Sequence, residues 1–351
     1  MRPADTAAAM LGRAALPVLL RLEPERAHAL ALRGLRFIRH AWRATSISPQ
    51  LGVELFGHRF AHPVGIAAGF DKDGDYLDAL GALGFSHIEV GTVTPRPQAG
   101  NARPRLFRIR DAHALVNRMG FNSKGADHVA QQLRASRYAG VRGISVGKNA
   151  DTPLERAVDD YLECLRKLYG VADYFAINVS SPNTTRLREL QAPDALARII
   201  DSLREERRRL EAHSGKFVPL LVKISPDLDE DELAASCAEF VRSGVDGVIA
   251  TNTTMQMDTL RDRPATQHGG GLSGAPLREK SLAVIRRLRL ELGTEMPIIG
   301  VGGIMNADDA IERLSAGANL LQLYTGFVYR GPALLVEILE AITRASPRAP
   351  A

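Results

Sequence analysis

Polar and glycine residues recur at the ends of short apolar stretches in this 351-residue chain. A buried strand has no packing reason to end in asparagine or lysine, so the repetition indicates a binding site. Amide side chains both donate and accept hydrogen bonds, which suits a large polar ligand that carries many carbonyl and N–H groups. The eight ends are residues 67–72, Gly91 and Thr92, 147–149, 178–183, Lys223, 251–253, Gly302 and Gly303, and Tyr324 and Thr325.

The last two of these ends predict a phosphate site. Residues 300–304 contain three glycines and precede a predicted helix near Ala307, and 324–326 follow closely. Backbone amides of glycine loops and helix N-termini bind phosphate, and barrels of parallel strands commonly place such a site after strands seven and eight. The nine histidines form no HxH pair, and the strand-end carboxylate Asp71 stands among amides rather than other acids, so we expect no metal site. No histidine at a strand end accompanies Ser181, so a Ser-His-Asp hydrolase is not supported.

The elements that would position these residues are eight strands, each followed by a helix. The predicted strands are nearly continuously apolar, as expected for parallel strands that are covered on both faces. Eight such units in series predict an α/β fold, a (β/α)8 TIM barrel. The predicted strands are 64–70, 87–94, 144–149, 174–181, 219–225, 247–253, 297–304 and 320–326, and the predicted helices lie near 75–84, 123–137, 154–169, 193–213, 230–243, 276–293, 307–316 and 331–344.

Two segments do not fit the eight units and predict extra strands. Residues 52–64 would form a hairpin that closes the bottom of the barrel, and 104–117 would lie in a long loop on the active face. Nothing resembles a linker between two domains. We therefore predict one barrel domain over residues 46–351 and an N-terminal extension over residues 1–45.

The extension carries all of the net charge. Residues 1–50 hold eight arginines and three acidic residues, whereas the rest holds 37 basic and 37 acidic residues. A neutral body argues against a nucleic-acid partner. Residues 24–43 have a helical period with an apolar face (Ala27, Leu30, Ala31, Leu35, Phe37, Ile38, Ala41, Trp42) opposite an arginine-rich face. This pattern fits a helix in a membrane interface and, equally, a helix packed on the barrel with a solvated basic face.

Several long segments resemble class 2 dihydroorotate dehydrogenase, the membrane-associated, quinone-dependent enzymes of pyrimidine biosynthesis. The resemblance runs from about Leu51 to Tyr329. The segments that carry it are AAGFDKDGD (67–75), EVGTVTPRPQAGNARPRLFR (89–108), NRMGFNSKG (117–125), GKNADTP (147–153), INVSSPNT (177–184), VKISPD (222–227), ATNTT (250–254), GGLSGAPL (270–277), GVGGI (300–304) and LYTGFVY (323–329).

The resemblance implies one FMN per chain, oxidation of dihydroorotate to orotate, and transfer of the electrons to a membrane quinone. Matched position by position, it implies FMN contacts from Ala68, Gly69, Phe70, Asp71, Lys72, Thr92, Asn149, Asn178, Lys223, Thr251, Gly274, Gly303, Tyr324 and Thr325. It implies substrate contacts from Lys72, Asn117, Arg118, Met119, Gly120, Phe121, Asn178, Asn183, Asn252 and Thr253, and weaker quinone contacts from His28 and Arg108.

Residue roles follow from the same resemblance. Ser181 matches the catalytic base, which would take the C5 proton, helped by Thr184, Thr253 or a water because a hydroxyl is a weak base. Lys72 would place positive charge near substrate and flavin, and Lys223 would stabilise the reduced flavin. We further expect a monomer at the cytoplasmic face of the bacterial inner membrane, or at the mitochondrial inner membrane in a eukaryote.

Three alternatives remain open from the residues. A class 1 enzyme is expected to have cysteine at position 181, and a tRNA dihydrouridine synthase is expected to have a basic body. A non-catalytic membrane-bound barrel would not need Ser181, Lys72 and Lys223 together. One departure from the class 2 pattern stands at Thr185-Arg186, where the family often has Pro-Gly, so details of the predicted lid over the substrate are open.

Overall fold

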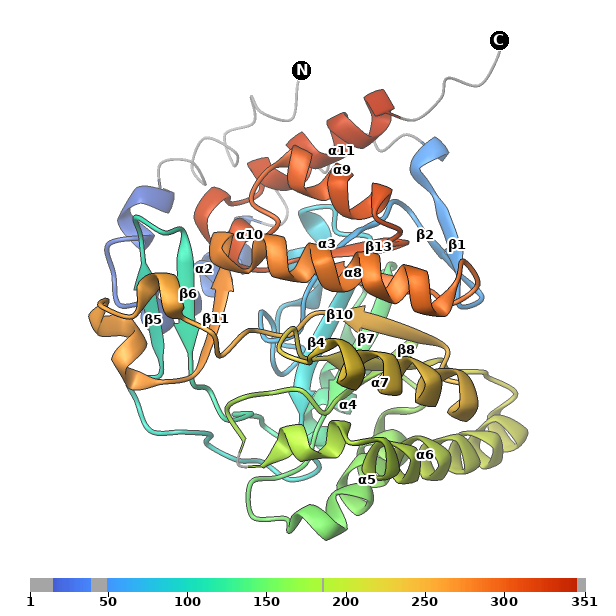
Figure 1. Cartoon of the computed structure of the whole chain (residues 1–351). Helices are drawn as coiled ribbons and strands as arrows, with labels where there is room; N and C mark the ends of the chain where they lie inside the picture. The colour runs from blue at the N-terminus through green and yellow to red at the C-terminus, as the bar shows by residue number, and fades with distance from the viewer. Residues whose placement is uncertain (1–14, 39–48, 185, 346–351) are drawn as a thin grey trace.

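Eight parallel strands close into a barrel, as the sequence predicted (Figure 1). A computed structural model of the chain describes residues 15–38, 49–184 and 186–345. Neighbouring strands follow chain order around the barrel, and the last strand pairs with the first. The strands are β3 (Val64–Ile66), β4 (His87–Val93), β7 (Val141–Val146), β8 (Tyr174–Asn178), β9 (Leu220–Ile224), β10 (Gly247–Ala250), β12 (Ile298–Val301) and β13 (Leu320–Leu323).

A helix follows each barrel strand, and the helices surround the strands in Figure 1. They are α3 (Leu77–Ala82), α4 (Ala126–Ala135), α5 (Ala157–Leu168), α6 (Pro193–Ser214), α7 (Glu230–Ser243), α8 (Arg278–Leu292), α9 (Ala307–Ser315) and α11 (Ala333–Ala345). Shorter helices are α10 (Thr325–Arg330), η2 (Pro49–Leu51), η3 (Leu154–Arg156), η4 (Leu187–Gln191), η5 (Asp258–Leu260), η6 (Pro264–His268) and η7 (Ala275–Leu277). Of these shorter helices, η3 and η7 overlap predicted helices, α10 overlaps the end of the predicted strand 320–326, and η2 adjoins the predicted hairpin 52–64.

Most strands end earlier than predicted. The predicted strand 174–181, for example, leaves the ladder after Asn178, and 179–184 form a loop. The polar residues at these ends therefore belong mainly to loops, where backbone and side-chain polar groups are free to face a ligand rather than a neighbouring strand.

The barrel interior is filled by side chains from alternate strand positions, as the pleat requires. Phe60, Val141, Leu221, Ile249 and Leu320 belong to this inner cluster. The hairpin β1 (Val53–Leu55) and β2 (His58–Phe60) closes the bottom of the barrel, because Phe60 is fully buried there. The predicted bottom hairpin is thus confirmed.

The second extra segment forms strands β5 (Leu106–Ile109) and β6 (Ala114–Asn117), which pair antiparallel as a hairpin. A third strand, β11 (Gly271–Gly274), adds to β6 and was not predicted. Its sequence, Gly-Leu-Ser-Gly, has neither β-branched residues nor apolar alternation, so only pairing with a distant partner makes it a strand. This small sheet lies to one side of the barrel beside α2 (Figure 1).

Helix α2 spans Pro24–Ile38, and the rest of the predicted helix, 39–43, lies outside the described residues. It packs against α3 and β5. Ala27 and Leu32 are buried in this contact, although Leu32 was not on the predicted apolar face. Leu30 is half-exposed and Phe37 is 84% exposed. The helix therefore packs on the barrel and still presents apolar side chains outward.

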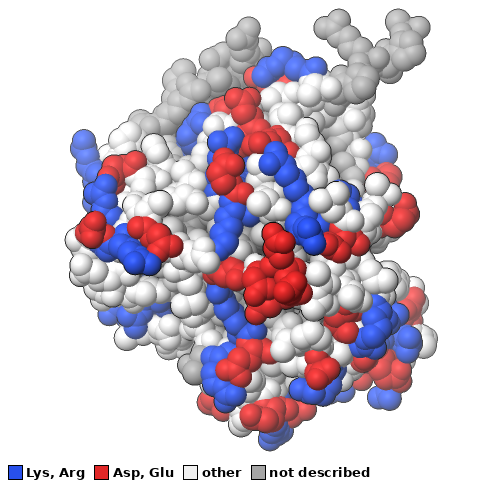
Figure 2. All heavy atoms as spheres, viewed as in Figure 1, with Lys and Arg blue, Asp and Glu red and all other residues white. Residues whose placement is uncertain are grey.

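Charged side chains of both signs are interspersed over the face of the molecule shown in Figure 2. Many form exposed ion pairs within helices, such as Arg186 with Glu189 and Arg287 with Glu291. The two cysteines, Cys164 and Cys237, are buried and free. Among the described residues, no helix combines the length and apolar composition needed to cross a membrane.

Candidate active site

A pocket of about 1040 Å³, the solvent space at its mouth included, lies at the carboxyl ends of the barrel strands. In parallel barrels this end carries the chemistry, because loops from all strands converge there. Most of the predicted site residues line it: Ala68, Gly69, Lys72, Thr92, Asn117, Met119, Gly120, Phe121, Asn178, Ser181, Asn183, Lys223, Thr251, Asn252, Thr253, Gly274, Gly303, Tyr324 and Thr325.

Four predicted contact residues lie outside this lining. The Asp71 carboxylate accepts hydrogen bonds from the amides of Asp75 and Tyr76, so it shapes its own loop. Asn149 pairs with the backbone of Arg96, and Arg118 donates to the carbonyl of His268. Phe70 faces the second pocket described below.

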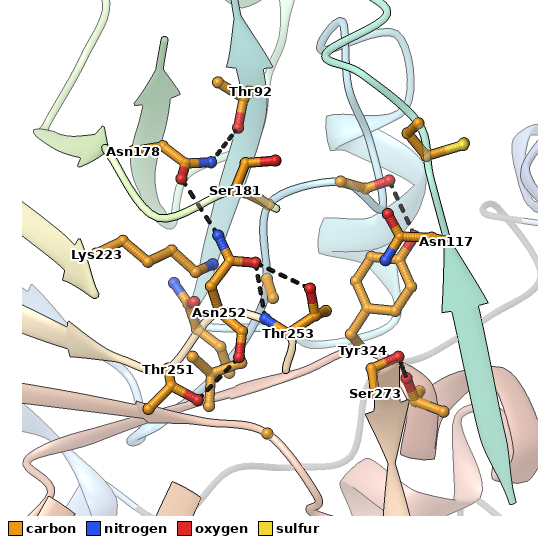
Figure 3. A pocket seen from close by; sticks show the side chains of 18 of the residues that line it. Thr92, Asn117, Asn178, Ser181, Lys223, Thr251, Asn252, Thr253, Ser273 and Tyr324 are labelled. Carbon is orange, nitrogen blue, oxygen red and sulfur yellow. Dashed lines mark hydrogen bonds between the residues drawn. The ribbon is translucent and has the colours of Figure 1, made fainter. Parts of the chain in front are cut away.

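A chain of polar side chains crosses the pocket floor (Figure 3). Asn178 Nδ2 donates to Thr92 Oγ1 at 2.8 Å, and Asn252 Nδ2 donates to Asn178 Oδ1 at 3.2 Å. Asn252 Oδ1 in turn accepts from the amide of Thr253. These bonds fix which amide edge each asparagine presents, so the pocket offers a preset pattern of donors and acceptors.

Ser181 lies in the loop after β8, buried at the edge of the pocket. Its Oγ accepts a 3.3 Å hydrogen bond from the amide of Asn183. Asn183 Oδ1 and Thr184 Oγ1 are buried and have no hydrogen-bond partner among the described residues. Because unpaired buried polar atoms are costly and Asn183 lines the pocket, its free Oδ1 indicates a polar ligand here.

Lys72 brings a titrating cation to the opposite rim. Its Nζ donates to Asn122 Oδ1 at 2.6 Å. Burial, assisted by the positive charge of Arg105, lowers the pKa of Lys72 to about 7. The ammonium is therefore poised to lose its charge near neutrality, and an anionic ligand beside it would favour the charged form.

Two glycines shape the expected phosphate end of the pocket. Gly303 has φ +68°, and a Cβ there would lie 2.3 Å from the Cα of Arg278. Gly274 has φ +98°, and a Cβ there would lie 2.2 Å from the carbonyl oxygen of His113. Neither position tolerates a side chain, so the backbone itself can approach a ligand closely. The amide of Asp309 in α9 is capped by Asn306, so the glycine loop is the better phosphate candidate.

Helix α2 is connected to the substrate side of the pocket through Arg105. Arg105 Nη2 donates to Glu25 Oε1 of α2 at 2.8 Å, and its Nη1 donates to the carbonyl of Asn101 at 3.0 Å. Asn101 Nδ2 reaches the carbonyls of Arg118 and Asn183. The extension thus supports the loops that bear the predicted substrate contacts.

A second pocket of about 1350 Å³ lies between the extension and the barrel. Its lining is almost entirely apolar, with leucines and alanines of residues 15–35 facing Leu106, Leu115 and Phe327. Tyr324 lines both pockets and is therefore part of the wall between them. Phe70 meets Tyr324 edge-on, with ring centroids 5.6 Å apart.

The two predicted quinone contacts, His28 and Arg108, both line this second pocket. His28 Nε2 pairs with the carbonyl of Phe70 at 2.8 Å, and burial lowers the pKa of His28 to about 4, so the ring is neutral at pH 7. Arg108 Nη1 donates to the carbonyls of Leu20 and Leu22. Its Nε is buried without a partner among the described residues, which leaves a donor for a carbonyl-bearing apolar ligand.

The predicted lid contains the departure at Thr185-Arg186. Thr185 lies outside the described residues. Arg186 has φ +56° and forms an ion pair with Glu189. Arg188 ties the start of this loop to the loops after β9 and β10, because it donates to the carbonyls of Ser180 and Thr253 and pairs with Asp227 at 2.9 Å.

Several lining residues were not singled out from the sequence. Asn122 holds Lys72 and belongs to the 117–125 motif, so its place in that motif was an available signal. Ser273, which lies in the unpredicted strand β11, shares a hydrogen bond with Thr325. Gln322 is a polar residue inside the apolar strand Leu-Leu-Gln-Leu, and this interruption could have marked it. Within residues 15–38, 49–184 and 186–345, no group of His, Cys, Asp and Glu could hold a metal ion.

Comparison with known proteins gives a consistent result. The family model described as dihydroorotate dehydrogenase matches residues 50–345. Proteins named dihydroorotate dehydrogenase (quinone) from Alkalilimnicola ehrlichii and Cellvibrio japonicus are each 51% identical over 93% of this chain, covering 97% and 96% of their own lengths. The crystal structure of DHODH in complex with ferulenol from Eimeria tenella aligns with a TM-score of 0.86 and 34% identity, covering 94% of both chains.

Proposed function

Because this chain belongs to the dihydroorotate dehydrogenase family, and to its quinone-dependent class, we propose that it oxidises dihydroorotate to orotate in pyrimidine biosynthesis, with FMN as hydride acceptor and a quinone as final electron acceptor. The observation that carries this proposal is the pair of pockets that share Tyr324. One is polar and suits a flavin and a pyrimidine; the other is apolar and suits a quinone.

The polar pocket fits one FMN per chain. The side-chain-free loops at Gly274 and Gly303 suit its phosphate, and Lys223, Thr92 and Asn178 line the floor where a flat ring with many polar atoms would lie. The buried Gln322 Oε1 has no partner among the described residues, so it is free to accept from such a ring. When bound, FMN supplies the two-electron acceptor that no side chain provides.

The chain's own residues supply binding and proton transfer. Asn117, Asn183, Asn252 and Thr253 offer amide and hydroxyl groups to the edge of the pyrimidine, and Lys72 offers a positive charge to its carboxylate. Ser181 would take the C5 proton as the hydride leaves C6. Thr184, Thr253 or a water would pass that proton on; Thr253 lines the pocket, and Thr184 Oγ1 has no hydrogen-bond partner among the described residues.

The apolar pocket is the proposed quinone path. The rings of Tyr324 and Phe70 lie where it adjoins the polar pocket, and the Arg108 Nε–H is the donor suited to a quinone carbonyl. The neutral His28 gives its Nε2–H to the Phe70 carbonyl, so its Nδ1 would accept a hydrogen bond from the hydroxyl of the reduced quinone. Val18, Leu22, Leu30 and Phe37 are exposed apolar side chains of the extension. Large apolar side chains in water favour contact with a lipid surface.

We therefore assign residues 1–45 to a membrane and quinone-access extension and residues 46–351 to the FMN-binding barrel. The enzyme would be a monomeric peripheral membrane protein at the cytoplasmic face of the bacterial inner membrane, or at the mitochondrial inner membrane in a eukaryote. The same assignment leaves no role for a nucleic-acid partner, because the charge of the barrel body is balanced.

The direct test is a spectrum of the purified protein. We expect a yellow preparation whose flavin absorbance bleaches on anaerobic addition of dihydroorotate and recovers with a soluble quinone. Fumarate and NAD, supplied separately, are expected not to restore the absorbance. A colourless protein that takes up no FMN, or a flavin that dihydroorotate cannot reduce, would refute the proposal.

Filling the apolar pocket should separate the two half-reactions. Ala31 lines this pocket on α2, so Ala31→Trp would occupy the space with an indole. We expect quinone-dependent turnover to fall by about tenfold, since overpacking a site typically costs 1–3 kcal/mol, with flavin reduction by dihydroorotate nearly unchanged. Stopped-flow measurement of each half-reaction checks this. Ala29→Trp, on the same helix but outside the lining, is the control, and equal slowing of both half-reactions would contradict the quinone path.

A further inference from the structure

Four polar side chains meet inside the barrel, beneath the polar pocket. They are Glu89 of β4, Tyr174 of β8, Lys223 of β9 and Gln322 of β13. Each occupies an inward position of its strand, among inward residues such as Ala176, Leu221 and Leu320. Glu89 is 0% exposed and Lys223 is 6% exposed. A full carboxylate at this depth needs a compensating charge or hydrogen bonds.

The Glu89 carboxylate is held in one orientation by neutral donors. Gln322 Nε2 donates to its Oε2 at 2.8 Å, and the Tyr174 hydroxyl donates to the same oxygen at 3.1 Å. Burial and the neighbouring Glu89 raise the pKa of Tyr174 well above its usual value, so this hydroxyl keeps its proton. Gly143 makes room for the tyrosine, because a Cβ there would lie 2.1 Å from the Tyr174 ring.

The second carboxylate oxygen faces a cation. Glu89 Oε1 accepts no hydrogen bond from the described residues and lies 3.6 Å from the Lys223 ammonium. Lys223 and Gln322 line the polar pocket, whereas Glu89 does not. Figure 3 shows the Lys223 side chain reaching from β9 toward the pocket centre. The ammonium therefore lies between a buried anion and the space assigned to the flavin.

We propose that Glu89 is a positioning residue that orients Lys223 and offsets its positive charge, and so sets the reduction potential of the flavin. The inference rests on the proposed function. A hydride from dihydroorotate carries two electrons and one proton, so it adds one negative charge to its acceptor. Lys223 favours that added charge and Glu89 opposes it, and burial strengthens both effects because little water screens them.

The test is the two-electron midpoint potential of the FMN-loaded enzyme, measured by spectroelectrochemical titration at fixed pH. Glu89→Gln removes the charge and keeps an acceptor oxygen for Gln322 and Tyr174. We expect the equilibrium to shift about tenfold toward reduced flavin, which is a rise of roughly 30 mV. Tyr174→Phe is the matched control, because it removes one hydrogen bond to the same carboxylate and leaves the charge; it should shift the equilibrium by less than about twofold.

A second variant keeps the test decisive. Glu89→Asp retains the charge but withdraws it from Lys223, so its potential should lie between those of the wild type and Glu89→Gln. Unchanged or lowered potentials in both Glu89 variants would overturn the inference. Loss of FMN from both would overturn it as well, because Glu89 would then be needed to assemble the site rather than to set its potential. Wild-type protein without flavin would instead refute the proposed function.

Discussion

Replacing Ser181 with alanine is expected to slow the reduction of flavin by dihydroorotate by about 10²- to 10⁴-fold at neutral pH, the usual contribution of a positioned general base. The hydroxyl is buried at the pocket edge, and among the described residues it accepts a hydrogen bond from the Asn183 amide alone. Without it, the C5 proton has no positioned acceptor, since the other nearby hydroxyl groups lie one step further along the proposed relay.

The measurement is anaerobic stopped-flow bleaching of the flavin, with FMN content and melting temperature recorded for each protein. Ser236→Ala is the control, because this buried serine of α7 donates to the carbonyl of Glu232 at 2.8 Å and lies outside the pocket lining. We expect this control to change the bleaching rate far less than Ser181→Ala does. Comparable slowing in the two variants would show that the Ser181 hydroxyl is not the base.

Binding of orotate is expected to weaken as pH rises through 7, by up to about tenfold for each further pH unit. The cause is Lys72, because burial, with the positive charge of Arg105, lowers its pKa to about 7. Below that pH the ammonium is already charged and the carboxylate of orotate binds to it directly. Above it the lysine is neutral, so binding must take up one proton, and each pH unit makes that proton tenfold scarcer.

Titrations of orotate against flavin absorbance between pH 6 and 9 give the dissociation constants. Calorimetry in two buffers that differ in ionisation enthalpy measures directly how many protons are taken up when orotate binds. The Lys72→Met variant should bind orotate more weakly, and its dissociation constant should show no change of slope near pH 7. Lys124→Met is the control, since hydrogen bonding and charge from Asp75 outweigh burial and raise the pKa of Lys124. A wild-type profile that is flat across this range, or a break that persists in Lys72→Met, would rule out this role.

The fold could be predicted almost completely from the sequence. Apolar runs such as His87–Val93 and Tyr174–Asn178 are local patterns, and their alternation with helical segments leaves few topologies. The strand ends were less accurate, because the chain leaves the ladder within a few residues of each strand, as at Gly69 and Gly302, where φ is positive. Strand β11 was missed because nothing in its own sequence marks it as a strand. It is a strand because it pairs with β6, which lies more than 150 residues away in the chain.

The sequence predicted which residues line the candidate site but not which groups their side chains contact. Thr92, Asn178 and Lys223 line one pocket, as chain order around a barrel implies. The roles of Asp71 and Asn149 are different, because their polar atoms turn to nearby backbone amides and carbonyls. No residue type or spacing distinguishes a side chain that faces a ligand from one that holds its own loop.

By itself, the sequence determined the eight strand–helix units and the polar ends that they bring to one rim, because both are properties of residues that are close in the chain. The tertiary structure alone decided which distant groups meet: Glu25 with Arg105, and Glu89 with Lys223. It also decided that Tyr324 is shared by two pockets of opposite polarity. These contacts depend on barrel closure and on side-chain direction, which only the packed molecule defines.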